Sequence, residues 1–191
     1  VYAALGHVWL TAAERRDDRV ALSKAVEALR QAASRPDPTS DTMTGLGRAL
    51  LLSGAPRGAE RAFRQAVSQL PVPPEAYLQL ANLAARDGRL QASRDALLSY
   101  ATLVGDDKPV VTVATRIGDY SMALGEPALA VRWFDRAMSE SGPSAALQAK
   151  LAQAAWPAGH IARAHRTVDE GLAAEPGNRV LQLLKQRLPP A

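Results

Sequence analysis

Four glycines recur along the sequence at nearly constant distances of 34, 37 and 34 residues: Gly54, Gly88, Gly125 and Gly159. Each stands between two segments in which apolar residues recur every three or four positions. This period predicts amphipathic helices, and a glycine between two such segments predicts a turn. The sequence therefore predicts an array of helical hairpins, in which each unit packs only against its neighbours.

The packing pattern of one hairpin is clearest in residues 43–71. Small Gly47 and Ala59 allow two helix backbones to approach closely, and Leu46 and Phe63 fill the space beside them. The same order of small and large residues recurs further along the chain. We therefore expect these four positions to lie at helix–helix contacts.

These residues resemble the tetratricopeptide repeat, whose signature of about 34 residues pairs a Leu-Gly step with a later small-x-x-x-Phe step and a closing Pro. Here the matching residues are Leu46 with Gly47, Ala59 with Phe63, and Pro71. The resemblance extends over nearly the whole chain. It implies an all-α fold, namely a right-handed superhelical solenoid of antiparallel helix pairs.

The repeats divide the chain as one domain of five hairpins and a capping helix. We expect the hairpins at about 1–38, 40–73, 74–108, 110–143 and 144–177, and the cap at about 178–188. Because the chain starts at Val1, seemingly within a helix, we expect it to be a piece of a longer protein.

Four local features refine this prediction. Ser40 or Asp41 is expected to cap the helix that follows it. The β-branched residues 110–115 are expected to be helical, because the repeat overrides their propensity. Three extra residues near 105–109 predict a longer turn, and Trp156 followed by proline predicts a short helix.

The composition argues against catalysis and against metal or nucleic-acid binding. There is no cysteine, and His160 and His165 are five residues apart, which places them on different faces of a helix. The formal charge is +4, but basic and acidic residues alternate along the chain instead of forming a basic patch. We therefore predict a protein that is not an enzyme and has no cofactor, no metal and no nucleic-acid partner.

The sequence contains no apolar run of the roughly 18 residues that a membrane-spanning helix needs. We therefore expect no membrane insertion. The richness in alanine and arginine is typical of bacterial proteins from GC-rich genomes. The absence of cysteine fits either the cytoplasm or the periplasm and favours the periplasm slightly. No oligomeric state follows from these features.

The resemblance implies that the first helices of the hairpins line a concave groove. The residue after each small packing residue should face it, and all five are polar: His7, Arg48, Asn82, Asp119 and Gln153. A second column, three residues further on, is apolar: Leu10, Leu51, Ala85, Met122 and Trp156. Adjacent polar and apolar columns suit an extended peptide.

Three cations are expected to make this groove attractive to an acidic ligand: Arg48, Arg116 and Lys150. Some tetratricopeptide repeats bind acidic C-termini through a clamp of Lys, Asn and Arg. Asn82 stands at the Asn position of this clamp, but Leu78 replaces its first Lys, so the clamp is incomplete. The predicted ligand-binding set is therefore His7, Arg48, Leu51, Asn82, Arg116, Asp119, Met122, Lys150, Gln153 and Trp156.

Trp156 has two alternative interpretations. It is either an exposed contact residue beside Lys150, or a core residue beneath the last helix, which is the commoner environment of a single tryptophan. We favour the core position slightly.

These observations predict a non-catalytic scaffold that binds a peptide or protein segment in the groove. Two alternatives stay open. In the first alternative, the chain is a structural spacer in a bacterial envelope assembly, such as an exopolysaccharide export or secretion component. In the second, it is the targeting domain of an enzyme that precedes Val1.

Overall fold

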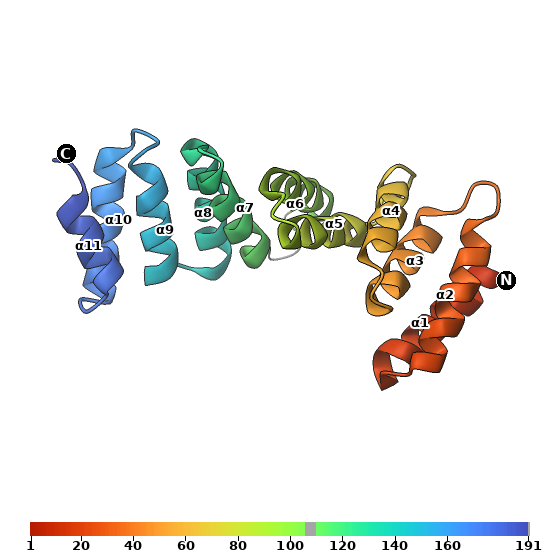
Figure 1. Ribbon diagram of the computed structural model, residues 1–191. Coiled ribbons are helices and arrows are strands. Elements are labelled where there is room, and N and C mark those ends of the chain that lie inside the picture. The colour runs from red at the N-terminus through yellow and green to blue at the C-terminus, as the bar shows by residue number, and fades with distance from the viewer. Residues whose placement is uncertain (106–109, 191) are drawn as a thin grey trace. The chain divides into compact units, whose positions relative to one another are not determined.

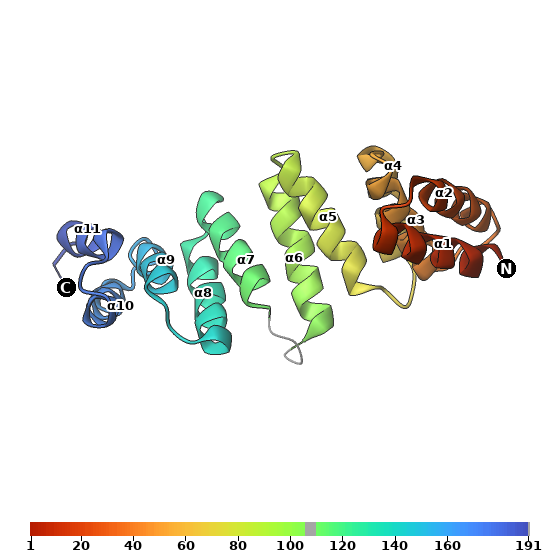
Figure 2. The ribbon, with the colours of Figure 1, turned by 90° about the horizontal axis from the view of Figure 1, so that it is seen from below.

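The computed structural model describes residues 1–105 and 110–190. This part of the chain forms eleven α-helices and no β-strand (Figure 1). The two helices of each hairpin run antiparallel, and the views in Figures 1 and 2 both show them side by side. The predicted all-α fold of five helical hairpins and a final helix is confirmed. The chain divides into two compact units, Val1–Tyr100 and Ala101–Ala191.

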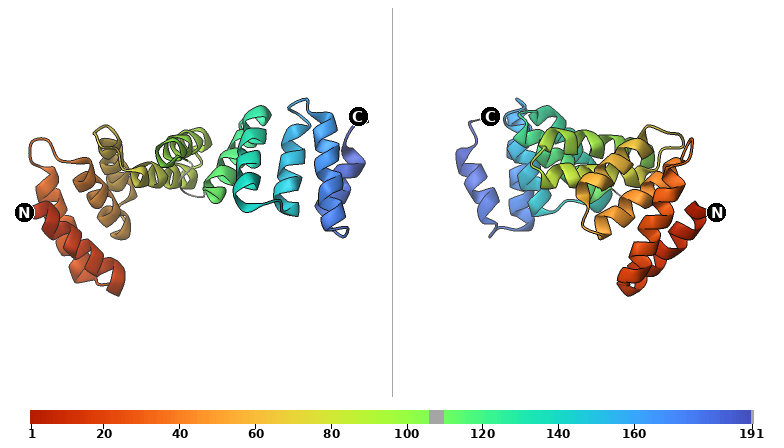
Figure 3. Two further views of the ribbon diagram at one scale, coloured as in Figure 1. Left: turned by 180° about the vertical axis from the view of Figure 1, so that it is seen from behind. Right: turned by 45° about the vertical axis from the view of Figure 1, so that its right-hand side comes forward.

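The first unit contains three hairpins, each made of a first and a second helix. The opening hairpin is the longest, since each of its two helices has 15 residues (Figure 3). The longer helices accommodate the extra residues of this repeat. The second helix of the third hairpin continues beyond Tyr100, where this unit ends. The helices are α1 (Tyr2–Arg16), α2 (Arg19–Ala33), α3 (Ser40–Leu52), α4 (Pro56–Val67), α5 (Pro74–Arg86) and α6 (Leu90–Val104).

The second unit contains two complete hairpins and the capping helix. Its elements are α7 (Val111–Ala123), α8 (Pro127–Ser141), α9 (Ala145–Ala155), α10 (Ile161–Ala174) and α11 (Arg179–Arg187). The apolar face of α11 is buried against α9 and α10 through Leu181, Leu184 and the adjoining Leu188. Its exposed side carries charged and amide side chains together with Val180 and Leu183.

Proline and glycine begin and end the hairpin helices as their backbone preferences require. Proline stands in the first turn of α4, α5 and α8, where it has no intrahelical hydrogen bond to lose. The four periodic glycines have φ angles between +70° and +82°, a left-handed conformation that glycine adopts without steric cost. The predicted turns are therefore confirmed.

The predicted cap of α3 is wrong by one residue. Thr39 is the N-cap, and its Oγ1 accepts a hydrogen bond from the Thr42 amide at 3.2 Å. Ser40 is buried and its hydroxyl donates instead to the Pro71 carbonyl at 2.6 Å. The Ser40 hydroxyl thus forms a hydrogen bond to a distant residue instead of capping the helix.

The other local expectations can be compared with the described residues. The β-branched segment is helical, because α7 begins at Val111. The helix before Pro157 is short, since α9 has 11 residues and Trp156 is its C-cap. Residues 106–109 of the expected longer turn lie outside the described residues.

Close helix contacts form where the sequence placed small residues beside aromatic ones. Phe63 and Phe134 are buried, and each ring lies against a helical glycine, Gly47 and Gly118 respectively. A Cβ atom on Gly47 would lie 2.6 Å from Cε1 of Phe63. Since interiors are packed as densely as organic crystals, this space admits no further atom without movement of the ring.

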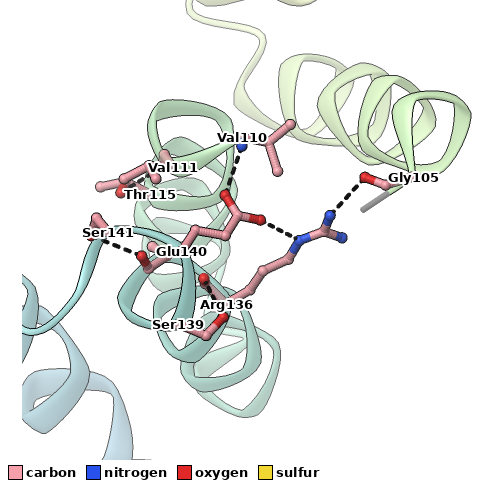
Figure 4. A network of polar contacts seen from close by, with 9 residues as sticks. Gly105, Val110, Val111, Thr115, Arg136, Ser139, Glu140 and Ser141 are labelled. Atoms are coloured by element: carbon pink, nitrogen blue, oxygen red, sulfur yellow. Dashed lines mark hydrogen bonds and ion pairs between the residues drawn. The ribbon is translucent and has the colours of Figure 1, made fainter. Parts of the chain in front are cut away.

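A polar network in the second unit ties α8 to the start of α7 (Figure 4). Glu140 accepts hydrogen bonds from the Val110 amide at 2.6 Å and from Nε of Arg136 at 3.0 Å. The same Arg136 donates through Nη2 to the Gly105 carbonyl at 2.9 Å. Glu140 therefore supplies α7 with a capping acceptor from another helix, at the end where the helix dipole favours negative charge.

We expect Glu140→Ala to lower the free energy of unfolding by about 1–2 kcal/mol, because the Val110 amide loses its acceptor. Urea denaturation followed by circular dichroism measures the change. Glu140→Gln keeps a side-chain acceptor and should lose less, and exposed Glu170→Ala is the matched control. Equal stability of Glu140→Ala and Glu170→Ala would contradict the capping role.

Candidate functional site

The predicted groove residues of the first unit lie along α1, α3 and α5, where one arginine joins three helices. Nη2 of Arg48 on α3 lies 2.5 Å from Oε1 of Glu14 on α1. Its Nε lies 3.3 Å from Oε1 of Glu75 on α5. Arg48 therefore lies on the side of α3 that faces the neighbouring first helices, and its place in a ligand-binding groove stays a prediction.

The other predicted residues of this unit are half-buried. His7 packs its ring over Gly45 of α3, and its Nε2 lies 3.0 Å from Oδ2 of Asp41. Leu51 packs against the core of the unit, and Asn82 on α5 is partly accessible. The face thus combines a bridging ion-pair network with a small accessible apolar area.

In the second unit, an ion pair between Lys150 of α9 and Asp119 of α7 joins two predicted site residues. Arg116 lies one turn before Asp119, with its Cζ 5.9 Å from the Tyr120 ring centre. Because Asp119 and Lys150 meet, the corresponding faces of α7 and α9 are adjacent. These residues therefore share a surface, and ligand binding by that surface stays a prediction.

The apolar column of the second unit is accessible at its end. Met122 is half-buried against the core, whereas Gln153 and Trp156 are exposed, and 39% of the surface of Trp156 is accessible. The core position that we favoured for Trp156 is therefore wrong. The reason is that α9 ends at Ala155, and the leucines of α11 already fill the space beneath the helix end.

The expected cationic character is reduced at two of its three positions. Arg48 is paired with two carboxylates and Lys150 with one, so neither adds an uncompensated positive charge to the face. The carboxylates come from helices that the repeat places alongside. Glu14 and Arg48 are separated by 34 residues, as are His7 and Asp41.

The sequence analysis did not select the acidic residues that contact the predicted site residues of the first unit. Glu14, Asp41 and Glu75 were not selected, although they meet predicted residues. The signal that would have found them is a pair of opposite charges about one repeat apart. This spacing places two side chains at equivalent heights on successive first helices.

Another charged network of the first unit joins α4 to the turn between α5 and α6. Glu60 of α4 lies 2.7 Å from Arg64 and 2.9 Å from Arg89, which also pairs with Asp87 at 2.9 Å. Hydrogen bonds to Asp87 and Glu60 raise the pKa of the Arg89 guanidinium. Glu60, Arg64 and Arg89 border a hollow of about 240 Å³ beside Tyr77, but their charges are satisfied by one another and by Asp87.

Among the described residues, no three side chains of the metal-binding types come together as a possible ion site. Of the helices in the described ranges, none combines the length and apolar character needed to cross a bilayer. The candidate site is a protein surface, lined in each unit by the first helices of the hairpins.

Among known proteins, only solved structures resemble this chain, and they support the fold. No protein-family model and no curated protein sequence matches the chain. A structure of MamA from AMB-1 is similar over 96% of this chain and 94% of its own, with 17% identity and a TM-score of 0.68.

Two further solved structures have the same arrangement of helices. YrrB, described as a TPR protein with an unusual peptide-binding site, is 12% identical over 97% of this chain and 90% of its own, with a TM-score of 0.65. PilF of Pseudomonas aeruginosa is 18% identical over 98% of this chain and 81% of its own, with a TM-score of 0.54. The chain therefore has a helical-repeat fold, and this fold is of the tetratricopeptide type.

Proposed function

We propose that this chain is a non-catalytic interaction scaffold, which binds a peptide or protein segment on the face formed by the first helices of its hairpins. The observation that carries the proposal is the exposure of Trp156, the residue that follows the last turn of α9. The likeness to YrrB, a repeat protein described with a peptide-binding site, supports the same class of function.

The chemistry around Trp156 suits a bound segment. A tryptophan offers a large rigid apolar surface together with an N–H donor, and it is enriched among residues that dominate binding energy. Gln153, one turn earlier, is exposed and supplies amide donors and an acceptor. Met122 has the equivalent place on α7 and adds an adaptable apolar contact. A ligand side chain would pack on Trp156 while its backbone meets the polar column.

The ion pairs decide which ligands this face favours. Because Asp119 already neutralises Lys150, a ligand carboxylate would have to compete with it. The face therefore selects a ligand mainly through apolar anchors, and an acidic charge adds only a small contribution. Raising the salt concentration should therefore weaken ligand binding by less than about tenfold. Salt screens mainly the exposed charges, and these contribute little to ligand affinity.

We expect Trp156→Ala to weaken ligand binding by about tenfold or more, as truncation of an interfacial tryptophan does. Peptides selected from a display library against the wild-type protein provide the ligands, and isothermal titration calorimetry measures their affinity. Leu183→Ala on α11 is the matched control, because Leu183 is also an exposed apolar residue. Selected peptides that bind Trp156→Ala as tightly as the wild type would refute the proposed site.

A further inference from the structure

The ring of Trp156 differs from the other two tryptophan rings of the chain, because no cation lies over it. Nζ of Lys24 lies 4.4 Å from the centre of the Trp9 ring, and Cζ of Arg136 lies 5.4 Å from the centre of the Trp133 ring. Within the described residues, no lysine or arginine takes this place over Trp156, although 39% of its surface is accessible. The face of an indole attracts cations. Trp156 is therefore free to receive one from a ligand.

A backbone acceptor one turn before this ring lacks its usual donor. In a regular helix the carbonyl of Gln153 would accept from the amide of residue 157, but Pro157 has no N–H. The amides on either side donate to other carbonyls, Trp156 to Ala152 and Ala158 to Ala154, each at 3.2 Å. In residues 1–105 and 110–190, no other group donates to the Gln153 carbonyl. This carbonyl belongs to an exposed residue and is available to a ligand.

The free carbonyl is specific to the fifth hairpin. In each of the other four, the residue four positions after the polar column has an N–H and lies within its helix: Thr11, Leu52, Arg86 and Ala123. The fifth hairpin is also the one whose member of the apolar column is aromatic. A large aromatic face and a free acceptor thus occur together at one place in the array.

Both features lie at the C-terminal end of α9, where the helix dipole is negative. Side chains of a helix lean toward its N-terminus, which directs Trp156 toward the turn that contains Gln153. A positive group is stabilised at this end of a helix, and a negative group is destabilised.

The charged side chains of the unit do not choose the ligand by themselves. Several are paired within the unit: Lys150 with Asp119, Arg163 with Asp135, and Lys185 with Asp169. Arg187, the last residue of α11, has no carboxylate partner among the described residues and would favour an anion. A carboxylate, however, can only accept hydrogen bonds, so it cannot satisfy the Gln153 carbonyl. It is also repelled by the negative face of the indole ring. The acceptor and the ring together therefore favour a cation that donates hydrogen bonds.

We propose that the partner segment places a basic side chain, arginine in particular, on Trp156. The guanidinium stacks on the indole and donates to the Gln153 carbonyl, and its planar fork of N–H groups allows both contacts at once. The apolar stem of arginine also suits a position that selects apolar anchors. This inference rests on the proposed function and adds the chemistry of the anchor residue.

Blocked single-residue probes test the anchor, and nuclear magnetic resonance of the indole N–H groups measures their binding. The probes are the N-acetylated amides of arginine, citrulline, norleucine and glutamate. Citrulline keeps N–H donors without the charge, and norleucine has neither. The arginine probe should bind about threefold more tightly than citrulline and about tenfold more tightly than norleucine.

The arginine probe should shift the indole signal of Trp156, which is identified by its loss in Trp156→Phe. The signals of Trp9 and Trp133 are the internal control. Their rings already carry a cation, so these signals should not move.

Pro157→Ala tests the carbonyl separately. The alanine N–H can donate to Gln153 and continue α9, which removes the free acceptor. Affinity for the arginine probe should fall about threefold or more, whereas affinity for the norleucine probe should not change. An unchanged norleucine affinity shows that Trp156 keeps its position, and circular dichroism verifies that the variant is folded.

Three results would overturn the inference. The arginine and norleucine probes bind at Trp156 equally, the glutamate probe binds there more tightly than the arginine probe, or Pro157→Ala leaves the arginine affinity unchanged. If Trp156→Ala still weakens the selected peptides, these results overturn the basic anchor alone. Selected peptides that bind Trp156→Ala as tightly as the wild type refute the proposed function instead, so the two failures are distinguishable.

Discussion

Phe63→Ala is expected to lower the free energy of unfolding by about 3–5 kcal/mol, the largest effect of any substitution considered for this chain. The Phe63 ring is completely buried in the core of the first unit, between α3 and α4. Its removal loses the transfer free energy of the ring and leaves a cavity. The surrounding alanines are too short to fill that cavity, and Gly47 has no side chain.

Urea denaturation measures this loss, followed by circular dichroism at 222 nm with the wild type alongside. Leu183→Ala removes an exposed apolar side chain and should change stability by no more than about 0.5 kcal/mol. If Phe63→Ala and Leu183→Ala were equally stable, Phe63 would not be the packed centre of the hairpin.

Gly47→Ala is expected to destabilise the protein by about 1–3 kcal/mol, because a new methyl group overpacks the contact with Phe63. Helix propensity alone would predict the opposite change in stability, because Ala is more favourable than Gly in a helix by about 1 kcal/mol. The new Cβ would lie 2.6–2.8 Å from three atoms of the ring. A buried ring is less able to move than the end of a flexible side chain.

Gly58→Ala is the matched control for this substitution. Gly58 lies in α4, and the nearest atom to its added Cβ would be Cδ1 of Leu50 at 3.4 Å, so propensity should decide the result and stability should not fall. Phe63→Leu in the Gly47→Ala background should recover part of the loss, because the shorter side chain makes room for the methyl group. Additive effects of the two substitutions would exclude a direct contact.

The arrangement of helices follows from local patterns that are legible in the sequence. Apolar periodicity gives the helices, and glycine at positions that need a positive φ gives the turns. The order of Gly47 and Phe63 correctly predicts a close contact, because packing within a hairpin involves residues near in sequence. The capping of α3 was predicted less well, since Ser40 is held by a distant carbonyl.

The candidate site depends more strongly on contacts between repeats. Polar residues such as Arg48 and Lys150 form ion pairs between first helices, and their role in ligand binding stays a prediction. Their carboxylate partners belong to neighbouring repeats, so the net charge of the face was not legible from one helix at a time. The exposure of Trp156 likewise depends on how α11 fills the space under α9.

The periodic small and apolar residues thus determine an array of tetratricopeptide-like hairpins, because helix formation and hairpin packing are governed by residues within one repeat. Tertiary structure alone decides which cations are neutralised and whether Trp156 is accessible. The physical reason is that charge compensation and burial depend on the neighbouring repeat, whose side chains are about 34 residues away in sequence.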